Sequence, residues 1–187
     1  MGRIFCYNDS GERFLFYIFF PNCDFFGGGF VRLVVCTDSR GGMMFNRRRT
    51  TYDRSVTEDI LRDAAGGRLL IAPYSQKIFR ILLLGEEDGM PKPKIDPEIE
   101  AALPYTVSDS PLDDAKDGDT VFIEDRDSRA YIEKITELVI YNWNITYPYD
   151  RRFDIDPKMD GFDLISVTEF PGMVHDIITK SVYRRKK

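Results

Sequence analysis

Three features of the sequence have residue types that chemistry uses: a run of glycines, three cysteines and one histidine. Gly27-Gly28-Gly29 permits a sharp turn or the close approach of a ligand. The run lacks the spacing of a dinucleotide fingerprint and the lysine of a P-loop, which favours a flexible turn over a phosphate cradle. Cys6, Cys23 and Cys36 do not have the spacing of zinc ligands.

A metal site is not expected. His175 is the one histidine, which excludes a histidine-rich site, and its place in the final hairpin turn predicts an exposed side chain. Asp154 and Asp156 have the chemistry of cation ligands, but shaping of the turn is the favoured interpretation. Cys6 and Cys36 lie in apolar runs, which predicts buried, reduced thiols and a cytoplasmic protein.

The charge pattern argues against nucleic acid as a partner. The formal net charge of -5 gives no overall basic field. Arg47-Arg48-Arg49 and the tail Arg184–Lys187 are local exceptions, and a solvated surface is the simpler interpretation of both. Phe14–Phe20 is strongly apolar but too short to span a bilayer, so no membrane segment is expected.

The elements that would position these residues are mostly strands. With 43% apolar and 30% charged residues, the chain is long enough for a single domain over residues 1–187. A helix is expected from a cap at Ser55 or Thr57 to Gly66-Gly67, another begins at Ser110-Pro111, and a short one spans about Arg129–Ile135. Strands are expected at Arg3–Tyr7, Arg13–Phe20, Phe30–Cys36, Arg68–Pro73, Ile78–Leu84, Tyr105–Val107, Thr120–Ile123, Glu137–Ile145, Phe162–Phe170 and Ile177–Arg184. This order predicts an α/β fold, with a mixed sheet flanked by helices and an antiparallel C-terminal hairpin.

The last third of the chain also contains a series of spaced motifs. Val121-Phe122-Ile123 precedes Leu138–Tyr141, an Asp-x-x-Phe turn follows at Asp150–Phe153, and Thr168–Phe170 and Ser181–Arg184 form the final hairpin. This order resembles the dihydrofolate reductase family, and the longer N-terminal region is closer to the family's larger phage-type members than to its compact bacterial ones. The resemblance implies a central mixed, mostly parallel twisted sheet.

Weaker similarities upstream imply the ligands. Asn46–Asp53 resembles the segment that opens the family's cofactor-binding helix. The resemblance implies NADPH as cofactor, with Arg49 pairing the 2′-phosphate and Thr50 and Ser75 adding contacts. It implies a small-molecule substrate, dihydrofolate or a related pterin, which would accept a hydride from the nicotinamide. The substrate residues would be Arg68, at the glutamate carboxylate, and Phe26 and Tyr141, lining the pocket.

Two departures from the family pattern support a second hypothesis. Arg32 stands six residues after Phe26, where the family has a helical carboxylate that supports protonation of the substrate. Glu124-Asp125 stands in place of the Gly-Gly turn at the cofactor pyrophosphate. The catalytic residue therefore stays unassigned. The alternative is a catalytically inactive domain of the same fold, acting as a binding or structural subunit with Arg47–Arg49 as a contact patch.

Overall fold

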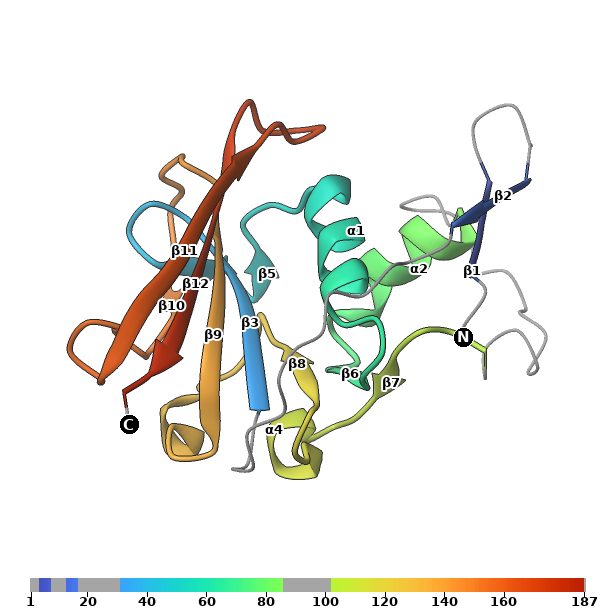
Figure 1. Cartoon of the computed structure of the whole chain (residues 1–187). Helices are drawn as coiled ribbons and strands as arrows, with labels where there is room; N and C mark the ends of the chain where they lie inside the picture. The colour runs from blue at the N-terminus through green and yellow to red at the C-terminus, as the bar shows by residue number, and fades with distance from the viewer. Residues whose placement is uncertain (1–3, 8–12, 17–30, 86–101, 187) are drawn as a thin grey trace.

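The computed structural model describes residues 4–7, 13–16, 31–85 and 102–186, and side chains from residue 31 onward (Figure 1). Phe26, Cys23 and the triple glycine lie outside the described residues, and of Cys6 only the backbone, in the first strand, is described. The elements in chain order are β1 (Ile4–Tyr7), β2 (Arg13–Phe16), β3 (Val31–Thr37), β4 (Gly42–Phe45), β5 (Arg48–Arg49), α1 (Arg54–Asp63), β6 (Leu69–Ile71), α2 (Gln76–Leu84), β7 (Thr106–Val107), α4 (Pro111–Asp114), β8 (Thr120–Phe122), the 3-10 helix η1 (Arg129–Tyr131), β9 (Ile135–Asn142), β10 (Arg151–Arg152), β11 (Phe162–Phe170) and β12 (Ile178–Arg185).

The main sheet has seven described strands in the order β11-β12-β9-β3-β8-β6-β7. From β9 to β7 all neighbours are parallel, whereas β12 pairs antiparallel with both β9 and β11. The expectation of a mixed, mostly parallel sheet with an antiparallel C-terminal hairpin is confirmed. Two smaller sheets accompany it, the β1-β2 hairpin and the group β10-β4-β5.

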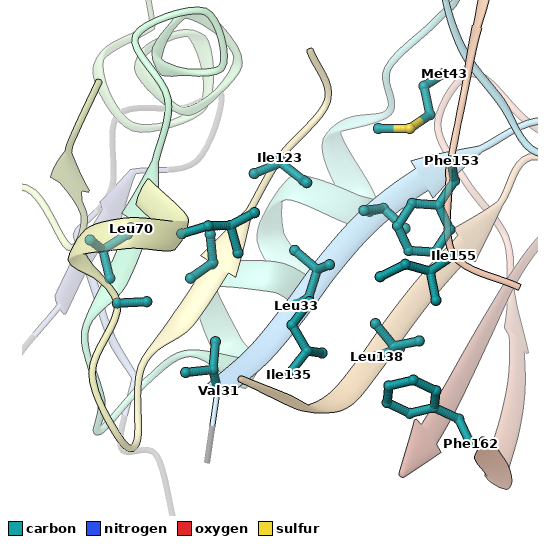
Figure 2. Packing of buried hydrophobic residues seen from close by; sticks show 14 of the residues in the cluster. Val31, Leu33, Met43, Leu70, Ile123, Ile135, Leu138, Phe153, Ile155 and Phe162 are labelled. Carbon is teal, nitrogen blue, oxygen red and sulfur yellow. The ribbon is translucent and has the colours of Figure 1, made fainter. Parts of the chain in front are cut away.

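Alternation along the central strands divides the core between the two faces of the sheet. Val31, Leu33 and Val35 of β3 point to one face, where they meet Leu70, Ile123 and Leu138 of neighbouring strands. Figure 2 shows this cluster extending to Phe153, Ile155 and Phe162. The residues between β10 and β11 therefore cover this face beside the C-terminal strands.

Helices α1 and α2 cover the opposite face. Val56 and Ile60 of α1 and Phe79 of α2 pack there against strand residues that include Val34 and Val139. The buried positions of α1 are four residues apart, so they form one stripe on the helix surface. Figure 1 shows the two helices beside the central strands.

Helix α1 begins earlier than the sequence indicates. Its N-cap is Asp53, whose Oδ1 accepts a hydrogen bond of 2.9 Å from the N–H of Ser55. The expected caps, Ser55 and Thr57, lie inside the helix instead. An aspartate in extended conformation satisfies a free N–H group of the first turn as well as a serine does. The local sequence therefore does not indicate which of Asp53, Ser55 and Thr57 caps the helix.

The segment Ile78–Leu84 is helical, which corrects the expectation of a strand. It forms most of α2, which ends at Gly85 with a left-handed φ of 65°. A continuous apolar run fits either a buried strand or a buried helix. The topology decides for a helix, because β6 and β7 are parallel neighbours and need a crossover connection between them.

The short helix expected near Arg129–Ile135 is shorter in the structure and consists of the 3-10 helix η1. Among the described residues, no helix has the length and apolar character to cross a membrane.

Candidate functional site

The carboxyl ends of β3, β6 and β8 lie at one edge of the parallel part of the sheet. Ligands of open α/β sheets bind at this edge, because the loops that leave it diverge and leave a crevice. Here the residues after β6 and β8 are Tyr74, Ser75 and Glu124, and Arg49 of β5 joins them. The candidate site therefore lies at this edge of the sheet.

Arg49 makes four contacts with this edge. Its Nη2 lies 3.4 Å from Oε2 of Glu124 and donates to the carbonyl oxygen of Tyr74 at 3.1 Å. Its guanidinium carbon lies 4.9 Å from the centre of the Tyr74 ring. The Arg49 N–H donates to the Tyr74 hydroxyl at 2.6 Å. Nη1 is buried and has no hydrogen-bond partner among the described residues.

Glu124 is the centre of the cluster. The Ser75 hydroxyl donates to its Oε2 at 2.8 Å instead of capping α2, although Ser75 is the N-cap residue. Only 5% of Glu124 is exposed. Burial raises the pKa of this carboxyl, and the charge of Arg49 and the Ser75 hydrogen bond oppose that rise. The turn after β8 thus presents a buried carboxylate to the cluster.

Cys36 on β3 lies close enough to this cluster for the charges of Glu124 and Arg49 to change the pKa of its thiol. Burial raises the pKa of its thiol well above the usual value; the nearby Glu124 charge raises it further and Arg49 lowers it. A protonated thiol is a poor nucleophile, so Cys36 is a packing residue. Thr50 follows Arg49, and its N–H donates to the carbonyl oxygen of Met43 at 3.3 Å. The structure therefore brings together Arg49 and Ser75, with Thr50 next in sequence.

The residues expected to hold a substrate lie apart from one another. Arg68 stands at the amino end of β6, where its Nη2 pairs with Oδ2 of Asp119 at 2.6 Å. Tyr141 is fully buried in β9, and its hydroxyl donates to Oδ2 of Asp59 at 2.8 Å. Burial, followed by the Asp59 and Asp63 charges, raises the Tyr141 pKa. Phe26 lies outside the described residues.

Arg32, at the position where the family has a helical carboxylate, lies in strand β3, as the strand expected at Phe30–Cys36 predicts. Its Nε donates to Oε1 of Glu137 at 2.6 Å. The next helix in the described chain is α1, whose buried positions are Val56, Thr57 and Ile60. That helix therefore turns no carboxylate into the core.

His175 is buried, contrary to the expectation of an exposed turn residue, with only 2% of its surface accessible. Its Nδ1 lies 3.2 Å from Oδ2 of Asp53. Its Nε2 lies 3.3 Å from the hydroxyls of both Thr51 and Tyr147, and the ring stacks on Trp143 with centres 4.6 Å apart. Only the tertiary fold brings these residues together, because they come from separate segments of the chain.

Asp53 connects the β11–β12 turn to the start of α1. Its carboxylate accepts the N–H groups of Met173 and Val174 at 3.0 and 2.7 Å, besides that of Ser55. Burial alone raises the pKa of Asp53, but these N–H groups and His175 outweigh it and lower the pKa to about 2. Gly172 leaves the room that this contact needs, since an added Cβ would lie 2.8 Å from the His175 carbonyl oxygen.

A groove of about 580 Å³ runs between α1 and the strands β9, β12 and β11. Along it, Lys180 pairs with Asp59 at 2.7 Å and with Asp63 at 2.6 Å. Glu137 is buried and pairs with Arg32 at 2.6 Å and Arg184 at 3.1 Å. These charges neutralise one another, so the groove has no excess of either sign at its floor.

Comparison with known proteins agrees with the resemblance at the level of the fold. No family model matches the chain, and no curated protein matches it. A solved structure of dihydrofolate reductase from Enterococcus faecalis, complexed with NADP(H) and RAB-propyl, superposes with a TM-score of 0.53. The match covers 85% of this chain and 98% of that protein at 12% sequence identity. The chain therefore has a dihydrofolate reductase-like fold.

Proposed function

We propose that this chain is a catalytically inactive domain of the dihydrofolate reductase-like fold that acts as a binding subunit. Glu124 carries the proposal. The resemblance requires glycine backbone after β8, so that a pyrophosphate can approach, and a buried glutamate paired with Arg49 stands there. A carboxylate at that place repels phosphate charge, by about 1 kcal/mol or more per charge pair at surface-like dielectric.

The residues around the sheet edge support the same proposal. The reaction needs an acid near the pterin, and the buried side of α1 offers Thr57 beside two apolar residues. Arg68 and Tyr141 are each engaged by an internal carboxylate, Asp119 and Asp59. A folate clamp would need both to release these partners.

The second candidate is the NADPH-dependent reductase of dihydrofolate or a related pterin. The solved structure with a similar fold contains NADP(H), and Arg49, Thr50 and Ser75 occupy one edge of the sheet here. The buried Nη1 of Arg49 still has a free donor among the described residues, which a phosphate oxygen would accept. Under this candidate the protein is a cytoplasmic enzyme of one-carbon metabolism with small-molecule ligands and no nucleic acid partner.

Purified protein with NADPH and dihydrofolate separates the two candidates. The binding-subunit proposal expects no loss of nicotinamide absorbance and no thermal shift with NADPH or methotrexate. Turnover above the rate without protein would overturn it and establish the reductase.

A variant tests whether Glu124 is the obstacle. Glu124→Gly combined with Asp125→Gly restores the glycine turn and should produce a thermal shift with NADPH that the parent chain lacks. Asp127→Gly, at an exposed carboxylate paired with Arg151, is the matched control and should leave the response unchanged. An NADPH shift of equal size in the parent chain and the double variant would remove the role assigned to Glu124.

A further inference from the structure

Strand β11 is the end strand of the main sheet, and its outer edge has no strand partner among the described residues. It is nine residues long and pairs along its inner edge with β12 (Figure 1). An end strand exposes backbone N–H and C=O groups that can pair with another chain. Proteins protect such edges with short strands, lysine, proline or β-bulges. Phe162–Phe170 is long and has no lysine or proline, and its pairing with β12 shifts register between Leu164 and Ser166.

The exposed side chains of β11 are apolar to an unusual degree. Leu164, Ile165 and Val167 are 53%, 52% and 52% exposed. Met173 and Val174, in the following turn, are more exposed still. Exposed apolar side chains gathered along one strand are candidates for a surface that a partner covers.

The two faces of β11 differ in character. Leu164 stands opposite Tyr183 and Val167 opposite Ser181 in the register with β12, and Tyr183 packs against the core cluster of Figure 2. Ser166 and Thr168 face the other side and line the groove beside α1. A strand added at this edge would therefore need apolar side chains on one face and polar side chains on the other.

We propose that the free edge of β11 binds an extended segment of another protein by strand addition, with alternating apolar residues and a basic residue placed opposite Glu169. The inference rests on the proposed binding role and names the kind of partner. Backbone hydrogen bonds would supply affinity, and the alternating side chains would supply selectivity.

Charge argues for a different protein over a second copy of this chain. Two copies of β11 paired antiparallel over all nine residues would place Asp163 opposite Glu169 at both ends. Like charges directly opposite destabilise a strand pair. Asp163 already has a cation, Lys186 at 3.3 Å, whereas Glu169 contacts the Thr179 hydroxyl at 3.4 Å and no cation among the described residues. A basic residue of the partner would meet Glu169.

Selection from a displayed library of random nonapeptides, followed by fluorescence anisotropy with the selected peptides, tests the proposal on the full chain. We expect enriched peptides to alternate apolar and polar residues and to carry lysine or arginine. Leu164→Lys with Val167→Lys should weaken their binding at least tenfold, and both positions are exposed enough to tolerate lysine. Glu169→Lys should reverse the preference toward peptides with glutamate in place of the basic residue. Val107→Lys, at an exposed valine in β7 at the opposite end of the main sheet, is the matched control and should not change binding.

Each outcome decides the proposal. Charge reversal with Glu169→Lys, together with the loss in the lysine variant, supports it. An absence of enriched peptides, or peptides that bind the lysine variant unchanged, overturns it. Self-association of the parent chain in sedimentation that the lysine variant abolishes would assign the edge to a second copy, and would overturn the named partner. NADPH turnover would instead refute the proposed function, whatever the peptide result.

Discussion

The charged side chains of the parallel part of the main sheet are paired differently from those of the antiparallel part. At the carboxyl edge of β3, β6 and β8, one buried carboxylate, Glu124, is enclosed by Arg49 and Ser75. Between α1 and the antiparallel strands, Glu137 and Lys180 belong to a chain of ion pairs that lines an open groove. The edge where the resemblance implies a cofactor is closed by internal contacts, while the C-terminal strands keep accessible surface. The C-terminal strands, and not the carboxyl edge, therefore offer the surface on which a partner can bind.

The largest effect is expected in the antiparallel part, on removing Glu137. Glu137→Ala leaves Arg32 and Arg184 facing each other without their shared carboxylate, and should lower the free energy of unfolding by about 3 kcal/mol. Urea denaturation measures this. Glu137→Gln keeps the side-chain volume and a hydrogen-bond acceptor, so it should lower the free energy of unfolding by less. Equal stability of Glu137→Ala and the parent chain would show that the groove does not depend on this charge network.

The junction between the two parts depends on Asp53. Asp53→Ala removes both the N-cap of α1 and the acceptor that holds the β11–β12 turn. It should lower the free energy of unfolding by about 2 kcal/mol. Ser55→Ala, the neighbour whose N–H the cap accepts, is the control and should cost much less.

The pKa of Asp53 gives this junction a pH signature. Its folded pKa of about 2 lies below the usual value of 3.8, so its contribution to stability is present above pH 3.8 and is lost as pH falls toward 2. Denaturation of the parent chain across that range should show this loss, and Asp53→Ala should show less of it. Parallel pH profiles for the two proteins would contradict the assignment.

In the parallel part, the stability that Glu124 contributes should change with pH in the opposite direction. Burial raises the folded pKa of Glu124 above 4.5, so its contribution to stability is greatest below pH 4.5 and declines as pH rises through the raised value. Glu124→Gln removes that decline. We expect the difference in free energy of unfolding between the variant and the parent to shift toward the variant as pH rises through the raised pKa. A pH-independent difference would mean that Arg49 fully compensates the buried charge.

The smallest effect is expected at Arg68. Its pair with Asp119 is partly exposed, so Arg68→Ala should change the free energy of unfolding by about 1 kcal/mol or less. The proposed function expects dihydrofolate to bind neither the parent chain nor Arg68→Ala, and Arg68 lies at the amino end of β6, away from the candidate site. A loss of folate binding in Arg68→Ala, with intact stability, would revive the assignment of Arg68 to a substrate site.

Local pattern predicted much of the framework. The bounds of β11 were predicted as Phe162–Phe170, and the strand expected at Phe30–Cys36 corresponds closely to β3. These segments alternate or have β-branched residues between clear turn signals, so their state follows from nearby residues. The segment Ile78–Leu84 lacked such information, because its apolar run suits either structure and the connection between two parallel strands decided for helix.

The candidate site was less predictable for a related reason. Arg49 and Ser75 were placed in one site through the family resemblance, and the structure brings both onto Glu124. Their use in an internal ion cluster could not be foreseen, since pairing between distant residues depends on how β5, β6 and β8 meet. Arg32 lies in β3, within the strand expected at Phe30–Cys36, so the family's acid-bearing helix has no counterpart at that position.

The sequence by itself determined the α/β class, the C-terminal hairpin and the absence of a glycine turn after β8, because each depends on residue types at adjacent positions. Tertiary structure decided the rest. It buried His175 beside Asp53 and Trp143, which no local pattern indicated. It also placed Arg49 at the carboxyl edge and, among the described residues, left β11 without a partner on its outer side, because contacts between distant segments determine which charges are paired and which strands are covered.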